Sequence, residues 1–141
     1  MEILQKSNIL TGLAPEPHED AIRRCGKMLL DSGYVNERYI EGMLARDRSF
    51  STAIGNMIAI PHGEMAYKTE IASTGLVVLT YPDGVKWGDE TVKLVVGIAA
   101  KGDEHLKILE QIAEAFEDEA DVELVVRNAD ADAIYSLLHQ A

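Results

Sequence analysis

The spacing of apolar and polar positions predicts two helices in the first third of the chain. One helical face of segment 17–30 is apolar and carries Ala21, Ile22, Cys25, Met28 and Leu29. Gly33 is expected to end this helix, because glycine is common just past a helix C-terminus. A second helix is expected after Asn36, which would cap it, with Ile40, Met43 and Leu44 directed inward.

Three further apolar runs have the pattern of strands. Residues 54–60 form a short run that Pro61 must end, because proline has no N–H for the strand ladder. Residues 74–81 form a second run, and the turn-forming tripeptide Pro-Asp-Gly follows at 82–84. Residues 92–100 are almost continuously apolar, as expected of a buried central strand.

The last third of the chain is predicted to be helical. Segment 104–116 has apolar residues at helical spacing, and Asp103 stands where an N-cap is expected. Two short helices are expected around 119–127 and 131–139. Strands separated by helices indicate an α/β fold in which a mixed β-sheet is flanked by α-helices.

Length, charge and cysteine content narrow the class of protein. The 141 residues suit one domain, expected to span 1–141, and the net charge of −11 argues against non-specific nucleic-acid binding. The single cysteine, Cys25, excludes an intramolecular disulfide and a cysteine-based zinc site. The first residues lack a signal-peptide pattern, and no apolar run reaches the roughly 20 residues of a membrane span. These features predict a soluble, cytoplasmic protein without membrane insertion.

Two of the four histidines lie where α/β folds gather their sites, at strand ends and helix starts. His62 follows the predicted strand 54–60 and stands between Pro61 and Gly63, which would present its ring at the rim. Neutral imidazole has a nucleophilic nitrogen, so His62 is either a group acceptor or an ordinary loop residue. His105 lies in the first turn of the next helix, on its apolar face. It is either a core histidine or a residue that keeps one nitrogen at an anion site beside the free helix N–H groups.

Other side chains are candidates for supporting an anion or a partner. Arg46 offers a guanidinium and Thr52 a hydroxyl, although each has an ordinary surface or loop interpretation. Trp87 is expected to serve packing or an interface rather than chemistry, and His18 and His139 are expected at the surface. An apolar rim for docking would draw on Ile54, Met57, Ile60 and Met65, with core packing favoured for Ile54 and Ile60.

The stretch IGNMIAIPHG at 54–63 resembles the active-site motif of enzyme IIA components of the phosphoenolpyruvate-dependent sugar phosphotransferase system, mannitol–fructose type. The likeness extends to 33–50 before the motif and to 81–116 after it. It implies a five-stranded α/β fold and a phosphohistidine relay without cofactor or metal. His62 would take the phosphoryl group on Nε2 from the phosphocarrier HPr and pass it to a cysteine of enzyme IIB. His105 matches the second active-site histidine and Arg46 a nearby arginine.

Several features bear on the sugar and on competing functions. The stretch YPDGVKWGDE at 81–90 favours mannitol, whereas Asn56, a possible supporting residue, and Glu64 depart from the pattern of some mannitol-type members. A fructose-type or a regulatory nitrogen-type enzyme IIA therefore stays open. The enzyme IIB and IIC parts are expected to be separate proteins. Cys25 lies on an apolar helix face and is not expected to be the family's phosphocysteine. Outside the family, a metal-dependent hydrolase using His62 and His105, or a pure interaction module, are the alternatives.

Overall fold

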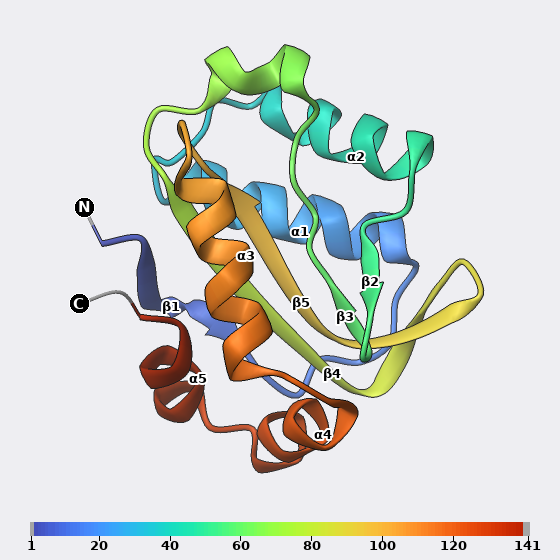
Figure 1. Cartoon of the computed structure of the whole chain (residues 1–141). Helices are drawn as coiled ribbons and strands as arrows, with labels where there is room; N and C mark the ends of the chain where they lie inside the picture. The colour runs from blue at the N-terminus through green and yellow to red at the C-terminus, as the bar shows by residue number, and fades with distance from the viewer. Residues whose placement is uncertain (1, 140–141) are drawn as a thin grey trace.

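Residues 2–139, the part that the computed structural model describes, form a five-stranded mixed sheet with helices on both faces (Figure 1). The strands are β1 (Leu4–Leu10), β2 (Ala53–Gly55), β3 (Ile58–Ala59), β4 (Gly75–Trp87) and β5 (Glu90–Ala99). Their order across the sheet is β1-β4-β5-β3-β2. The pairs β1–β4 and β3–β5 are parallel, whereas β4–β5 and β2–β3 are antiparallel. The predicted fold class is therefore confirmed.

Each face of the sheet has its own core. Helices α1 (His18–Asp31) and α2 (Tyr39–Ser49) cover one face, and α3 (Glu104–Ala115), α4 (Glu119–Asn128) and α5 (Ala131–Leu138) cover the other. Alternate residues of β4 serve the two layers: Val77 and Leu79 pack toward α1, and Leu76 and Val78 pack toward α3. Helices α1, α3, α4 and α5 begin and end close to the predicted bounds, whereas α2 begins at Tyr39 and not directly after Asn36. No helix among residues 2–139 is both long and apolar enough to cross a membrane.

The predicted strand 54–60 is a hairpin. Its chain turns at Asn56 and Met57, both with positive φ (52° and 64°), so that β2 pairs back onto β3. Left-handed backbone at both positions suits a two-residue hairpin turn, whose twist matches the strands. The sequence hides this turn because an apolar methionine stands where glycine usually signals it.

The tripeptide 82–84 is a bulge inside β4, and the predicted end of that strand there is wrong. The β4–β5 register shifts between Thr80 and Val85, and β4 continues to Trp87. Pro82 lies in this unpaired stretch between Thr80 and Val85, so its missing N–H leaves no gap in the ladder. The turn between the two strands lies instead at Gly88 and Asp89.

Two local expectations near the N-terminal half also differ. Arg38, not Asn36, occupies the N-cap position of α2, and no side chain caps that helix. β1 was not predicted, because this edge strand buries few residues and exposes Lys6 and Ser7 in its middle. A short 3₁₀ helix, η1 (Met65–Glu70), follows the His62 loop.

Candidate active site

The sheet brings His62 and His105 to one edge. The chain leaves β3 and continues along β5, where the Ile98 N–H donates to the Pro61 carbonyl at 2.9 Å. His62 thereby lies beside the end of β5, and α3 begins only a few residues after that strand. Because β3 and β5 are parallel, their carboxyl ends meet at the same edge. The ring centroids of His62 and His105 are 5.1 Å apart, with an interplanar angle of 53°.

One nitrogen of the His62 ring is fixed by the backbone. Nδ1 lies 2.8 Å from the Ile60 carbonyl oxygen. A carbonyl only accepts, so Nδ1 carries the hydrogen of the neutral ring and Nε2 keeps its lone pair. Burial lowers the pKa of His62, and the nearby His105 and Arg46 add to this lowering, which outweighs the opposing bond to Ile60. The ring is therefore neutral at pH 7, with Nε2 available as a nucleophile.

His105 is half-buried in the first turn of α3, and it lines the same cavity as His62. Burial lowers its pKa, as does the charge of Arg46. Two N–H groups of this helix start are already bonded: Glu104 donates to Lys101 at 3.3 Å and Leu106 to Asp103 at 3.2 Å. Fewer free N–H groups thus face an anion than the sequence predicts, and side chains must supply more of the charge stabilisation. Asp103 does occupy the predicted N-cap position, but its side chain makes no capping bond.

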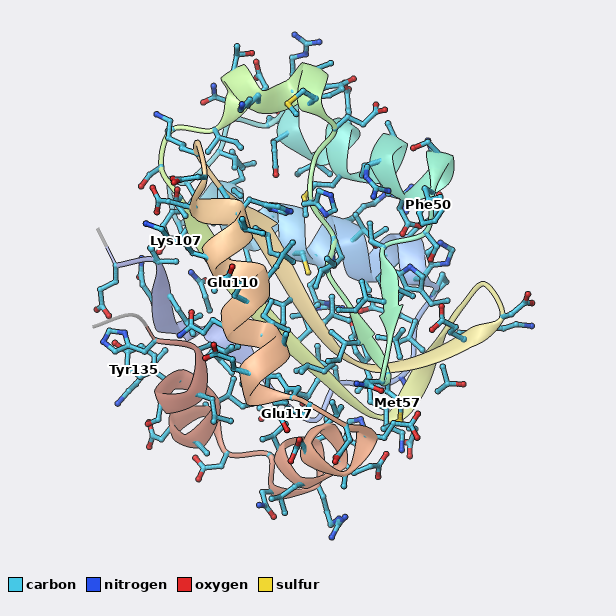
Figure 2. All side chains as sticks on the ribbon, in the orientation of Figure 1. Phe50, Met57, Lys107, Glu110, Glu117 and Tyr135 are labelled. Carbon is cyan, nitrogen blue, oxygen red and sulfur yellow. The ribbon has the colours of Figure 1, made fainter. Side chains whose placement is uncertain are left out.

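Arg46 comes from the last turn of α2 and completes the cationic side of the cavity. Its Nη1 donates to the Phe50 carbonyl, and its Cζ lies 5.9 Å from the centre of the Phe50 ring. Figure 2 labels Phe50 at the outer end of α2, where the chain passes toward β2. The cavity has a volume of about 390 Å³ and is lined by Tyr39, Arg46, His62, Gly63, Glu64, Met65, Lys68, Ile71, Ala100, Gly102 and His105. It places a cation and two neutral imidazoles around one space that an anion can enter.

Thr52 and Asn56 lie elsewhere. Thr52 is buried, and its hydroxyl donates to Asp47 at 2.7 Å, so it does not reach into the His62 cavity. The amide of Asn56 donates to the Glu117 carbonyl at 3.2 Å. Both Asn56 and Glu117 line a second hollow, of about 370 Å³, between the β2–β3 hairpin and α3.

The apolar candidates divide between core and surface. Met65 is 78% exposed at the mouth of the His62 cavity, whereas Ile60 is 7% exposed and packs in the core as expected. Ile54 is 52% exposed on the second hollow, so the core packing favoured for it is wrong. Met57 is partly buried at the tip of the β2–β3 hairpin, where Figure 2 labels it. Trp87 is buried, as predicted.

Metal ligands do not gather in residues 2–139. No group of three His, Cys, Asp or Glu side chains within them lies close enough together to hold a metal ion. His62 and His105 therefore have no third ligand in the described part of the chain. Cys25 is buried, and burial raises the pKa of its thiol well above the ordinary range, so it is not a nucleophile.

Comparisons with known proteins identify the family of this chain. The family described as "Phosphoenolpyruvate-dependent sugar phosphotransferase system, EIIA 2" matches residues 2–141. The chain belongs to this family. Mannitol-specific phosphotransferase enzyme IIA components of Staphylococcus aureus (strain MRSA252) and Geobacillus stearothermophilus are each 40% identical to it. Each match covers 99% of this chain and 97% of the relative.

Solved structures of the enzyme IIA family match the whole fold. The crystal structure of the mannitol IIA protein of Escherichia coli superimposes with a TM-score of 0.87 at 35% identity, covering 95% of this chain and 97% of the other. A complex of that IIA protein with phosphorylated enzyme IIB matches with a TM-score of 0.88 at 34% identity, covering 96% and 97%. The EIIA architecture, with its five-stranded mixed sheet, is thus shared along nearly the full length.

Tyr39 is a supporting residue of the candidate site that sequence reasoning missed. Its hydroxyl accepts from the Gly63 N–H at 2.9 Å and donates to the Ile98 carbonyl at 2.8 Å, which ties the His62 loop to β5. A Cβ on Gly63 would lie 2.5 Å from the Tyr39 ring. Gly63 therefore permits the close approach of the Tyr39 ring to the His62 loop. The available signal was spacing, because Tyr39 precedes Met43 by one helical turn on the same face.

Proposed function

We propose that this protein is a phosphohistidine relay of the sugar phosphotransferase system. It accepts a phosphoryl group from HPr on Nε2 of His62 and passes it to a cysteine of enzyme IIB for mannitol uptake. The observation that carries the proposal is the His62–Ile60 hydrogen bond, which leaves Nε2 unprotonated in a cavity shared with Arg46 and His105. The full-length likeness to mannitol-specific relatives supports the sugar, and the relay operates in the cytoplasm.

The first transfer needs positioning and charge stabilisation more than covalent help from the protein. The P–Nε2 bond forms as the bond between phosphorus and the donor atom on HPr breaks. Nε2 has no proton to lose, because the ring hydrogen is on Nδ1. As the attacked ring gains positive character, its hydrogen bond to the Ile60 carbonyl strengthens, so this backbone group stabilises the transition state.

The phosphorylated ring then carries close to two negative charges, which Arg46 and an N–H of His105 stabilise. In the second transfer a P–S bond forms as the P–Nε2 bond breaks, and the neutral ring returns. The cavity opens to the surface beside exposed Met65 and Lys68. That opening suits an intermediate that must meet two partners in turn. The structure of the Escherichia coli IIA protein with phosphorylated enzyme IIB supports the choice of partner.

Intact-protein mass spectrometry tests the relay. The protein is incubated with phosphoenolpyruvate, enzyme I and HPr, alongside His62→Gln and the control His139→Gln, which removes a ring outside the cavity. Wild type and His139→Gln should each gain one acid-labile phosphate, and His62→Gln none. Phosphate on His62→Gln would falsify the site. Absence of phosphate on wild type would favour the alternatives outside the relay, a metal-dependent hydrolase or a pure interaction module.

A second step tests the sugar. Purified phosphoprotein is mixed with enzyme IIB of a mannitol permease or of a fructose permease. Loss of phosphate to the mannitol IIB at a much higher rate supports mannitol. Transfer to the fructose IIB favours a fructose-type component, and transfer to neither favours a regulatory, nitrogen-type role.

A further inference from the structure

Asp47 is a buried carboxylate immediately after Arg46 on the last turn of α2. Its Oδ1 accepts three hydrogen bonds: from Thr52 N at 2.9 Å, Thr52 Oγ1 at 2.7 Å and Trp87 Nε1 at 3.0 Å. Its Oδ2 lies 3.2 Å from Nε2 of His18. The carboxylate thus fixes the end of α2 to the segment that leads into β2.

That segment is connected by hydrogen bonds to both Arg46 and His62. On one side, Phe50 accepts from Arg46 and lies under its guanidinium. On the other, the Thr52 carbonyl accepts from the Ile60 N–H at 2.9 Å, and the Ile60 carbonyl accepts from His62. Thr52 therefore stands between the group that holds Arg46 and the group that holds His62.

Phe50 does not hold this segment by its own packing. Its side chain is 73% exposed, and Ser51 after it is exposed as well, whereas Thr52 is only 2% exposed. The buried anchor nearest to Phe50 in the segment is thus the pair of hydrogen bonds from Thr52 to Asp47. The Phe50 N–H donates to the Arg46 carbonyl at 3.1 Å, but the Phe50 carbonyl belongs to the next peptide unit, whose direction depends on the Thr52 anchor.

We propose that Asp47 and Thr52 form a positioning pair that holds Arg46 toward His62 and His105. The proposal rests on the proposed phosphoryl relay, because it assigns the pair a part in that reaction. Thr52 does not touch the phosphoryl group; its hydroxyl is already bonded to Asp47. Its contribution is to fix where Arg46 meets the developing negative charge, and a small displacement of such a group slows transfer strongly.

The matched variants are Thr52→Val and Thr80→Val. Each removes one buried threonine hydroxyl and keeps the side-chain shape; Thr80 is 0% exposed, and its hydroxyl accepts from Gly12 at the other side of the sheet. The readout is the pKa of His62 and of His105, measured by NMR titration of ¹⁵N-labelled protein. Arg46 lowers both values, so both should rise in Thr52→Val. Thr80→Val should leave both unchanged, and Glu64 and Lys68, which also line the cavity, are the same in both variants.

The same proteins are then phosphorylated with HPr. Thr52→Val should accept phosphate about tenfold more slowly than Thr80→Val. In an Arg46→Ala background, Thr52→Val should change neither the two pKa values nor the rate any further, because it acts through Arg46. Equal effects of the two threonine variants, or a full further effect in the Arg46→Ala background, overturn the proposal. If wild type takes no phosphate, the relay itself fails, while the titration still decides whether the pair positions Arg46.

Discussion

The last turn of α2 serves two histidine clusters that differ in what surrounds the rings. Asp47 points into a closed cluster in which His18 lies 3.2 Å from the carboxylate and 5.1 Å, centroid to centroid, from Trp87. Arg46 points into the open cavity of His62 and His105. Within residues 2–139 neither of these two rings has a carboxylate at ion-pair distance. In one cluster the carboxylate is bonded by donors of the same cluster, and in the other Arg46 faces two rings with no described carboxylate at ion-pair distance.

The difference shows that two adjacent residues at one helix end have separate roles, one in stability and one in chemistry. Burial raises the pKa of Asp47, but the bonds from Thr52 and Trp87 and the charge of His18 outweigh it, so the pKa lies below its ordinary value. The carboxylate is thus ionised and fully bonded, which makes the cluster a structural element. In the cavity, burial and Arg46 keep the imidazoles neutral, which leaves a nucleophile facing a cation. An arriving phosphoryl group supplies the missing negative charge.

The largest expected effect is on the free energy of unfolding, and it distinguishes the two clusters. Asp47→Ala should lower the free energy of unfolding by about 3 kcal/mol, because two buried donors of Thr52 and that of Trp87 lose their acceptor. His62→Ala should cost about 1 kcal/mol or less, since one hydrogen bond of a half-buried ring is lost. Urea unfolding of both variants measures the contrast. Similar losses would mean that the open cavity is as structural as the closed cluster.

The next effect concerns the sign of charge in the cavity. Arg46→Glu should slow phosphoryl acceptance from HPr about a hundredfold, because a carboxylate there repels the phosphoryl group and favours the protonated ring. The control is Arg48→Glu, the same charge change on an arginine that pairs with Glu19 at the surface. It should leave the rate nearly unchanged, because exposed ion pairs contribute little. Equal slowing by both variants would assign the effect to net charge instead of to the cavity.

The pH dependence of phosphoryl acceptance gives a second test of the Arg46→Glu variant. A lowered pKa means that wild-type His62 stays neutral to lower pH than an ordinary histidine, so acceptance should fall only in acid. In Arg46→Glu the opposite charge raises the pKa, and the fall should move toward neutral pH. Rates measured across the acid range in both proteins test this shift. A profile that does not move would separate Arg46 from the titration of His62.

The sequence predicts the open cavity better than the closed cluster. His62 and His105 follow from one rule, that sites gather where strands end and helices begin. Arg46 follows from its guanidinium as an anion partner and from the family resemblance. Asp47 escapes notice because it stands among charged residues in RDRS, a run typical of a solvated helix end. Its burial depends on Trp87, which arrives from β4 forty residues later in the chain.

The errors at 54–60 and at 82–84 have a related cause. Alternation and turn residues report what a segment prefers by itself, whereas pairing with β5 decides whether it turns or continues. Asn56 and Met57 take left-handed conformations without a glycine at either position, and Pro-Asp-Gly is absorbed as a bulge. Thr52 was predicted to support the anion directly. The structure places its hydroxyl on Asp47 instead, at a buried position one residue before β2 begins.

The smallest expected effect tests which part of the closed cluster is essential. The side chain of His18 is 34% exposed, and of the two Asp47 oxygens it reaches only Oδ2. The three hydrogen bonds donated to Oδ1 therefore remain when His18 is replaced. His18→Gln should therefore lower the free energy of unfolding by less than about 1 kcal/mol and leave phosphoryl acceptance unchanged. Urea unfolding and the HPr assay measure the two quantities. A loss as large as that of Asp47→Ala would mean that the cluster depends on its histidine, and the contrast with the His62 cavity would then lie only in access to solvent.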